Sequence, residues 1–295
     1  MVASVVLAYA SLNSMRRNLQ QRIVTALVLV GILVTAVVFL PLPGLALLFG
    51  MVVTISAWEW ARLAGYADRS LRGVYVMGVV LVMLGLYWYC QLGGTPNLDR
   101  IQPLFGLAGL WWAIALLWIK GYPGSAVLWS TPAMLSLMGL LVLIPAWLAA
   151  VFLLTYEYGK LMLLAMVILV AGADIGAYFT GRQFGRRKLA PLVSPGKSWE
   201  GVVGGLLAVV ILAVAAHQAL ELDRLSLAGA VAIAVTGALS SVVGDLLESM
   251  VKRQRGVKDS GTILPGHGGF LDRIDGITAA APVVSLGLIL AGWLP

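Results

Sequence analysis

The sequence has little cysteine, little histidine and little charge. Its single cysteine, Cys90, excludes an intramolecular disulfide and any metal site built from several cysteines. Only 11% of the 295 residues are charged, whereas 60% are hydrophobic and the mean hydropathy is +0.95. A soluble domain cannot bury so much apolar surface. The composition therefore excludes an ordinary soluble protein and indicates a chain that crosses a membrane several times.

Long uncharged stretches predict where the chain crosses. About 20 apolar residues in a helix span the hydrocarbon core of a bilayer. The predicted spans are residues 23–40, 44–63, 73–92, 101–119, 133–154, 161–180, 201–220, 225–247 and 276–294. We therefore expect an all-α, polytopic integral membrane protein with about nine transmembrane helices. We divide it into a cytoplasmic tail (1–22), an N-terminal transmembrane part of about five helices (23–160) and a C-terminal transmembrane part that carries two polar cytoplasmic segments (161–295).

The basic residues predict the orientation of these helices. With nine spans and a cytoplasmic N-terminus, all but three of the 20 Lys and Arg residues fall on the cytoplasmic side. The exceptions are Arg100, Lys160 and Arg224. The basic side attracts anionic headgroups and nucleotides alike, so charge alone does not separate a binding site from a topogenic signal.

One carboxylate, Asp174, lies inside a predicted span. Ionisable groups at that depth are costly and usually face a wet cavity or a partner, so they mark function. The alternative is a carboxylate that pairs with a neighbouring helix and serves packing alone. Glu59 lies between Trp58 and Trp60, and we interpret it as part of an interfacial aromatic belt, outside the site.

The first polar segment, residues 181–200, is basic and rich in glycine and proline. Lys197 and Ser198 directly precede a predicted helix, and helix N-termini suit phosphate groups. The segment lacks the first glycine and the spacer of a Walker A loop. Taken alone, it is equally compatible with an ordinary cytoplasmic loop.

The second polar segment, residues 244–275, is more specific. If the eighth span continues as a helix, Asp245, Ser249 and Lys252 share one face and offer a metal ligand, a hydroxyl and a phosphate clamp. The glycines of residues 265–269 can bring backbone N–H groups close to an anion. His267 in this turn is a candidate general base, or it merely hydrogen-bonds the turn.

The acidic residues of this region predict the metal. Asp272 and Asp275 lie three residues apart on the next helix, and Asp245 precedes them on the eighth span. Carboxylates without cysteine partners are hard oxygen donors that suit Mg²⁺. The carboxylates of this segment therefore indicate Mg²⁺ rather than a structural zinc.

The same residues carry a resemblance to a known family. The run from Ser249 to Arg253, then Lys258 and Asp259, and the stretch from Leu264 to Asp275 resemble the signature of phosphatidate cytidylyltransferases. Two positions depart from the family pattern: Ile175 replaces a hydroxyl residue, and Gly276 replaces serine. The resemblance implies a multi-pass enzyme of the bacterial inner membrane that converts CTP and phosphatidic acid to CDP-diacylglycerol and pyrophosphate. It also implies Mg²⁺ dependence and a homodimer, and no nucleic-acid partner is expected.

The motif positions and the charge argument together assign roles to the site residues. The predicted catalytic residues are Asp245, Asp272, Lys252 and Lys258. Asp245 and Asp272 are predicted to hold Mg²⁺, with Asp174 and Asp275 as outer ligands or as ligands of a second cation. The predicted substrate-binding residues are Lys197, Ser198, Ser249, Arg253, His267, Gly268, Gly269 and Arg273. The active site is expected at the cytoplasmic face.

Two other functions compete with this interpretation. An ion-coupled transporter would also place a carboxylate inside the bilayer, but its polar residues should continue to the opposite face. A different CTP-dependent lipid enzyme, such as a polyprenol kinase, would share the nucleotide chemistry. Labelled products formed from CTP and several lipid acceptors would separate these functions.

Overall fold

The structure, a computed structural model, describes residues 24–25, 27–220, 225–264 and 268–294. Eight of its helices are long and apolar enough to cross a membrane. They are α2 (Leu42–Ala64), α3 (Arg69–Tyr89), α4 (Leu98–Gly121), α6 (Pro132–Leu154), α7 (Gly159–Phe184), α8 (Trp199–Ala219), α9 (Leu227–Gln254) and α10 (Leu271–Leu290). A shorter apolar helix, Leu27–Phe39, occupies the first predicted span. The predicted all-α, polytopic membrane fold is confirmed.

Polar side chains mark where several of these helices begin. An N-cap side chain satisfies a backbone N–H group that has no partner within the helix. The caps are Asp68 for α3, Asn97 for α4, Thr131 for α6, Ser198 for α8 and Ser226 for α9. Helix starts near these positions are therefore encoded locally, even though the spans themselves are recognised by hydropathy.

Two helices extend beyond their predicted spans. The predicted spans end at residue 247 and begin again at residue 276, whereas α9 continues to Gln254 and α10 begins at Leu271. Charged residues do not end a helix that has left the apolar layer, so hydropathy underestimates these ends. Both charged extensions carry predicted site residues, which are consequently held on rigid helices.

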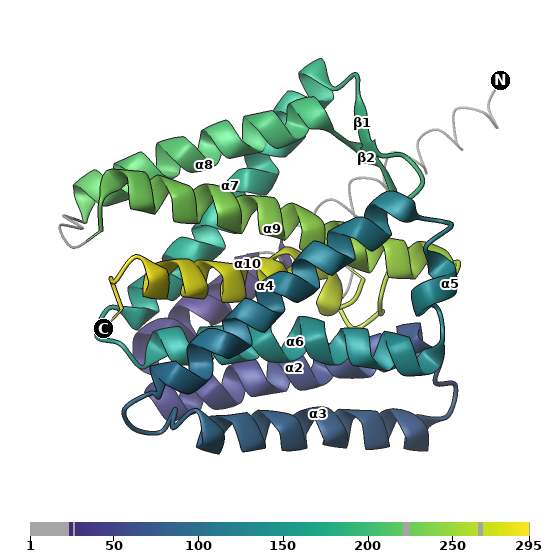
Figure 1. Ribbon diagram of the computed structural model, residues 1–295, viewed down its shortest axis with the longest axis horizontal. Coiled ribbons are helices and arrows are strands. Elements are labelled where there is room, and N and C mark those ends of the chain that lie inside the picture. The colour runs from purple at the N-terminus through teal and green to yellow at the C-terminus, as the bar shows by residue number, and fades with distance from the viewer. Residues whose placement is uncertain (1–23, 26, 221–224, 265–267, 295) are drawn as a thin grey trace, which may run out of the picture.

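The helices form two groups joined by a central layer (Figure 1). Helices α2, α3 and α6 lie together at one end of this view, and α7 and α8 lie at the other, with α4, α9 and α10 between them. Helix α6 is hydrophobic over nearly its whole length, and 72% of an apolar 18-residue stretch within it is buried. A helix that is apolar on all sides is stable where neighbours surround it, and α6 forms the core of the N-terminal part.

Helices α7 and α8 are packed at backbone distance. A Cβ atom added to Gly205 would lie 2.7 Å from the carbonyl oxygen of Ala173, and one added to Gly176 would lie 2.9 Å from that of Gly204. Small residues permit such close approach in membrane helices. We call this contact the glycine seam. It fixes α7, and with it Asp174, against α8.

The first polar segment forms a small β-hairpin rather than a loop. Strands β1 (Lys188–Ala190) and β2 (Ser194–Ser198) pair antiparallel, with Lys188 opposite Ser198. The Glu200 carboxylate accepts hydrogen bonds from the backbone N–H groups of Arg186 and Arg187 at 3.1–3.2 Å, which anchors the hairpin to α8. The hairpin is the exception to an otherwise helical fold, and it holds Lys197 in place.

Candidate active site

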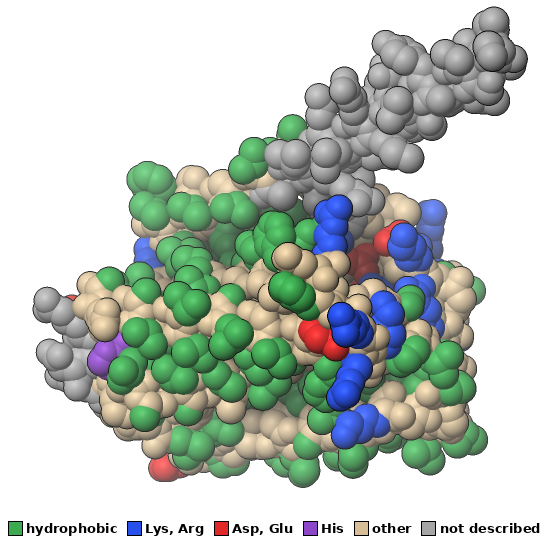
Figure 2. Space-filling model, turned by 90° about the horizontal axis from the view of Figure 1, so that it is seen from above, with side chains coloured by type: hydrophobic (Ala, Val, Ile, Leu, Met, Phe, Trp, Pro, Cys, Tyr) green, Lys and Arg blue, Asp and Glu red, His purple; other side chains and the backbone are tan. Residues whose placement is uncertain are grey.

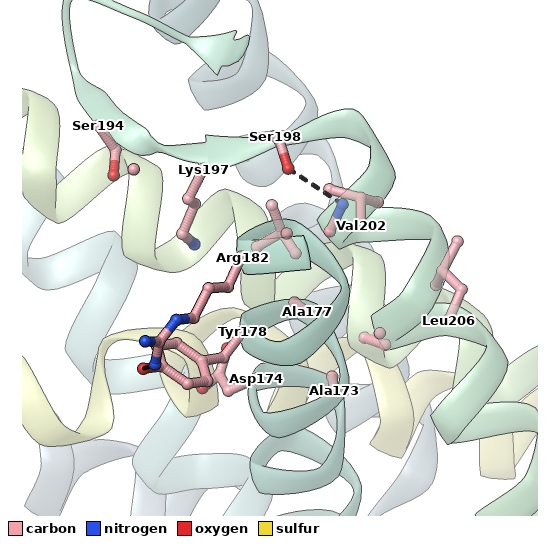
Figure 3. Close-up of a pocket in the computed structure, with 16 residues that line it drawn as sticks. Ala173, Asp174, Ala177, Tyr178, Arg182, Ser194, Lys197, Ser198, Val202 and Leu206 are labelled. Atoms are coloured by element: carbon pink, nitrogen blue, oxygen red, sulfur yellow. Dashed lines mark hydrogen bonds between the residues drawn. The ribbon is translucent and has the colours of Figure 1, made fainter. Parts of the chain in front are cut away.

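A cavity of about 430 Å³ lies between α7, α8, α9 and the hairpin (Figure 3). Polar groups line one part of it, and alanine, valine and leucine side chains line the rest. Asp174, Tyr178 and Arg182 reach it from α7, and Lys197 extends toward them from β2. The hydroxyl of Tyr178 accepts a hydrogen bond from Arg182 at 3.1 Å. The cavity therefore combines an apolar lining with charged groups of both signs.

The two polar segments of the sequence meet beside this cavity. The Lys197 ammonium lies 2.6 Å from Oδ2 of Asp245 on α9. The Ser249 hydroxyl, one helical turn further along α9, donates to Oδ1 of Asp245 at 3.1 Å. Both side chains of the ion pair remain partly accessible, Lys197 by 24% and Asp245 by 33%. This pair, which we call the cavity pair, joins residues that lie 48 positions apart in the sequence.

A second lysine–aspartate pair lies deeper, between α9 and α10. Nζ of Lys252 is 2.6 Å from Oδ1 of Asp272 and 3.2 Å from Oε1 of Glu248. The side chains of Lys252 and Asp272 are only 10% and 5% exposed. We call Lys252 and Asp272 the buried pair. The Lys252 ammonium, which was predicted to bind a substrate phosphate, is therefore in contact with two carboxylates of the protein itself.

Asp272 also organises the connection between α9 and α10. Its Oδ2 accepts hydrogen bonds from the backbone N–H and the hydroxyl of Ser260, both at 3.0 Å, and from the N–H of Gly269 at 2.8 Å. Gly268, which precedes this contact, has a φ of 80°, a conformation that glycine adopts without strain. The backbone N–H of Gly269, which was predicted to bind a substrate, therefore binds the Asp272 carboxylate. Both oxygens of that carboxylate already have partners, Lys252 at Oδ1 and Ser260 and Gly269 at Oδ2.

The other predicted acidic residues lie in different surroundings. Asp174 is exposed at the cavity, within electrostatic range of Lys197 and Asp245. Asp275 lies one turn beyond Asp272 on α10, and its Oδ1 accepts the N–H of Gly276 at 2.8 Å. Among the residues that the structure describes, no three His, Cys, Asp or Glu side chains are arranged to hold a metal ion. The carboxylates gather in one region, but lysines occupy the positions next to Asp245 and Asp272.

The remaining predicted residues serve local structure or lie on the surface. Ser198 is buried and caps α8 through the N–H of Gly201 at 3.1 Å. Arg253 is exposed and donates to the carbonyl of Val193 at 3.2 Å, tying α9 to the hairpin. Lys258 and Arg273 are exposed. His267 lies outside the described residues.

Three residues in this region were not predicted: Glu59, Glu248 and Ser260. Glu248 precedes Lys252 by one helical turn, and that spacing is a signal that sequence reasoning can use. Both carboxylate oxygens of Glu248 are buried, and neither makes a hydrogen bond to the described part of the chain despite the nearby Lys252 ammonium. Ser260 contributes the contacts to Asp272 given above.

The interpretation of Glu59 as an interfacial belt residue was wrong. Its side chain is 3% exposed and accepts the backbone N–H of Phe270 at 3.1 Å and that of Leu271 at 2.8 Å. It therefore packs against the start of α10, 211 positions away in the sequence. The flanking tryptophans suggested a membrane interface, but Trp60 is itself buried and donates to the carbonyl of Leu135.

Comparisons with known proteins agree with this arrangement. A family model described as the cytidylyltransferase family matches residues 20–290. A protein named phosphatidate cytidylyltransferase from Pseudomonas aeruginosa is 47% identical over 93% of this chain and 98% of its own length. Proteins of the same name from Haemophilus influenzae and Thermotoga maritima are 40% and 32% identical, each over 90% of this chain and over 97% and 94% of their own lengths. The chain therefore belongs to the cytidylyltransferase family.

Proposed function

We propose that this protein transfers the cytidylyl group of CTP to phosphatidic acid and forms CDP-diacylglycerol and pyrophosphate. The observation that carries the proposal is the cavity pair, because Lys197, paired with Asp245, brings a partly exposed ammonium to a cavity that is lined mainly by apolar and small side chains. The names of the related proteins support the same substrate. A lipid phosphate needs such a mixed site, since its acyl chains stay in the membrane while its headgroup meets a water-soluble nucleotide.

The reaction depends on the positioning of the two substrates and on charge neutralisation more than on a general base. A phosphate monoester has a second pKa of about 6, so the lipid phosphate is largely dianionic at neutral pH and can attack without losing a proton. One of its oxygens forms a bond to the α-phosphorus of CTP, and the bond from that phosphorus to the bridging oxygen of the β-phosphate breaks. The site must align two anions and stabilise the charge on the departing pyrophosphate.

The two lysines are suited to different parts of this task. Lys197 is partly exposed at the cavity and held by a single carboxylate, so its ammonium can turn to a phosphate that enters the cavity. Lys252 is fixed by Asp272 and Glu248 and supplies a stationary positive charge. Lys258 and Arg273 are exposed and are proposed to meet the phosphates of the nucleotide from the aqueous side.

The donor set fits Mg²⁺, which we propose as the cofactor. The carboxylates in this region are hard oxygen ligands of the kind that Mg²⁺ prefers, and Lys197 and Lys252 now contact two of them, Asp245 and Asp272. Asp245 would hold the ion in place of its contact to Lys197, and Asp272 would hold it in exchange for one of its present contacts. Asp174 and Asp275 would lie around them or at a second cation. When bound, Mg²⁺ supplies charge neutralisation at the phosphates.

We also propose an inner-membrane location with the N-terminus and the active site on the cytoplasmic side, and a homodimeric assembly. Lys and Arg side chains gather at one end of the molecule, whereas apolar side chains cover much of the remaining surface in this view (Figure 2). That distribution is typical of a membrane protein whose basic end faces the cytoplasm. The homodimer rests on the family resemblance.

The test is an assay of the purified protein in detergent with labelled CTP and phosphatidic acid. We expect labelled CDP-diacylglycerol and pyrophosphate in the presence of Mg²⁺ and neither product after chelation. Diacylglycerol and a polyprenol serve as competing acceptors. A labelled product from either of these, with none from phosphatidic acid, would overturn the substrate assignment.

A further inference from the structure

Glu59 stands apart from the site residues in sequence but lies against them in the fold. It belongs to α2, in the N-terminal part, whereas both polar segments belong to the C-terminal part. Its carboxylate accepts the N–H of Phe270 on Oε1 and the N–H of Leu271 on Oε2. These N–H groups open the first turn of α10, where a negative charge is favourable because the helix dipole presents its positive end.

Ser260 connects Glu59 to the buried pair. Its hydroxyl oxygen lies 3.3 Å from Oε2 of Glu59 and 3.0 Å from Oδ2 of Asp272. The hydroxyl has one proton to donate, and the backbone N–H of Ser260 also donates to Oδ2 of Asp272 at 3.0 Å. Ser260 is completely buried. The two carboxylates are therefore held on either side of one serine, at a fixed separation.

Two glycines allow this close contact. A Cβ atom added to Gly261 would overlap the Glu59 carboxylate, and one added to Gly269 would overlap the Ser260 hydroxyl and lie 2.7 Å from Oε2 of Glu59. Any other residue at these positions would have to displace the carboxylate or the chain. The backbone of the α9–α10 connection thus closes directly around the end of the Glu59 side chain.

The last turn of α2 strengthens the same contact. Arg62 donates to the carbonyl of Asp259 at 3.2 Å, and Arg255 donates to the carbonyls of Leu63 and Ala64. The start of the connection between α9 and α10 is therefore attached to α2 at two further points, both of which precede Ser260 in the sequence. A buried carboxylate without partners is costly, and the partners of Glu59 all come from this connection and the helix that follows it.

We infer that Glu59 is a positioning residue, which fixes the α9–α10 connection and the first turn of α10 so that Asp272 meets Lys252. The inference rests on the proposed function, because it assumes that the buried pair acts in the transfer reaction. Glu59 itself does not touch the substrates. It acts through Ser260 and through the backbone of Phe270 and Leu271, and its negative charge is required because N–H and O–H donors surround it.

The test compares Glu59→Gln with Glu59→Asp in the full-length protein, purified in detergent. Gln has the same size but places an amide nitrogen beside N–H donors, whereas Asp keeps the charge on a shorter side chain. We expect Glu59→Gln to lower kcat by roughly 10- to 100-fold, the range in which small displacements of reacting groups act. KM for CTP should stay within about threefold, and Glu59→Asp should recover part of the loss. A residue that only fills space would tolerate Gln better than Asp.

The matched control is Ser56→Ala, one turn earlier on α2. Ser56 is completely buried, and its hydroxyl bonds to the carbonyl of Val52 in its own helix. We expect this variant to keep wild-type kcat. The amount of folded protein is measured by size-exclusion chromatography, and kcat is expressed per folded molecule.

Two outcomes would overturn the inference: a kcat for Glu59→Gln within threefold of wild type, or an Asp variant less active than the Gln variant. Should Glu59→Gln not fold, Ser260→Ala decides in its place, because it removes the link and keeps both carboxylates. Unchanged kcat in Ser260→Ala would then refute the positioning role, and a tenfold loss would support it. Wild-type activity with phosphatidic acid, measured in parallel, separates failure of this inference from failure of the proposed function.

Discussion

The cavity pair and the buried pair have the same chemistry and the same separation but very different surroundings. In both, a lysine Nζ lies 2.6 Å from an aspartate oxygen. The cavity pair is about a quarter to a third exposed and bridges the hairpin to α9, whereas the buried pair is 10% and 5% exposed and is surrounded by Glu248, Ser260 and Gly269. The comparison indicates that the cavity pair is accessible to a ligand, whereas the buried pair holds the α9–α10 connection in place.

The largest effect is expected from Lys252→Met, which tests whether the buried pair is structural. The substitution leaves Glu248 and Asp272 without their ammonium. Breaking a buried pair in this way costs about 3–5 kcal/mol. We expect a clear fall in the midpoint of thermal unfolding in detergent, together with loss of turnover. An unchanged midpoint would show that the buried pair contributes no more to stability than the cavity pair.

The next effect separates the two aspartates. Asp272→Asn and Asp245→Asn should each lower turnover by roughly 10² or more, because each would remove a ligand of the proposed Mg²⁺, whose charge stabilises the transition state. Only Asp272→Asn should also loosen the α9–α10 connection, which faster amide hydrogen exchange at Ser260 and Gly269 would report. Near-normal turnover in either variant would remove that aspartate from the proposed metal site.

Lys197→Met addresses the cavity pair directly. Since its ammonium is partly exposed, its loss should change stability by about 1 kcal/mol or less. We expect turnover to fall roughly tenfold or more, because a phosphate in the cavity would lose its cation. Thermal unfolding and initial rates, measured on the same preparation as Lys252→Met, provide the contrast. A fall in the unfolding midpoint as large as that of Lys252→Met would abolish the distinction between the pairs.

The smallest effect is expected from Ser249→Ala. Its hydroxyl donates one hydrogen bond to Asp245, and such a bond contributes about 0.5–1.5 kcal/mol. That range corresponds to a loss of turnover of roughly two- to tenfold. Initial rates at saturating CTP measure it. A loss as large as that of Asp245→Asn would mean that Ser249 contacts a substrate rather than merely orienting the aspartate.

Much of the fold could be predicted because hydropathy and helical spacing can be read from short, continuous stretches of the sequence. The spans, the extension of α9 and the neighbourhood of Asp245 and Ser249 follow from run length and helical spacing. The hairpin did not follow, since its glycine- and proline-rich sequence has no strand periodicity. The role of Glu59 did not follow either, because its partners lie about 200 positions later in the chain. A buried carboxylate can be assigned only when its donors are known, and tertiary packing supplies them.

The glycine seam makes one wall of the cavity from main chain. The space at Gly205 is closed by the carbonyl oxygen of Ala173, so backbone geometry sets the position of that wall. Enlarging Gly205 would force α7 and α8 apart instead of merely narrowing the space. The opposite wall is different, since Ala238 and Val242 of α9 present ordinary side chains to the cavity. The shape of the cavity can therefore be changed through the side chains of α9, or through Val202 and Leu206 of α8, without separating α7 from α8.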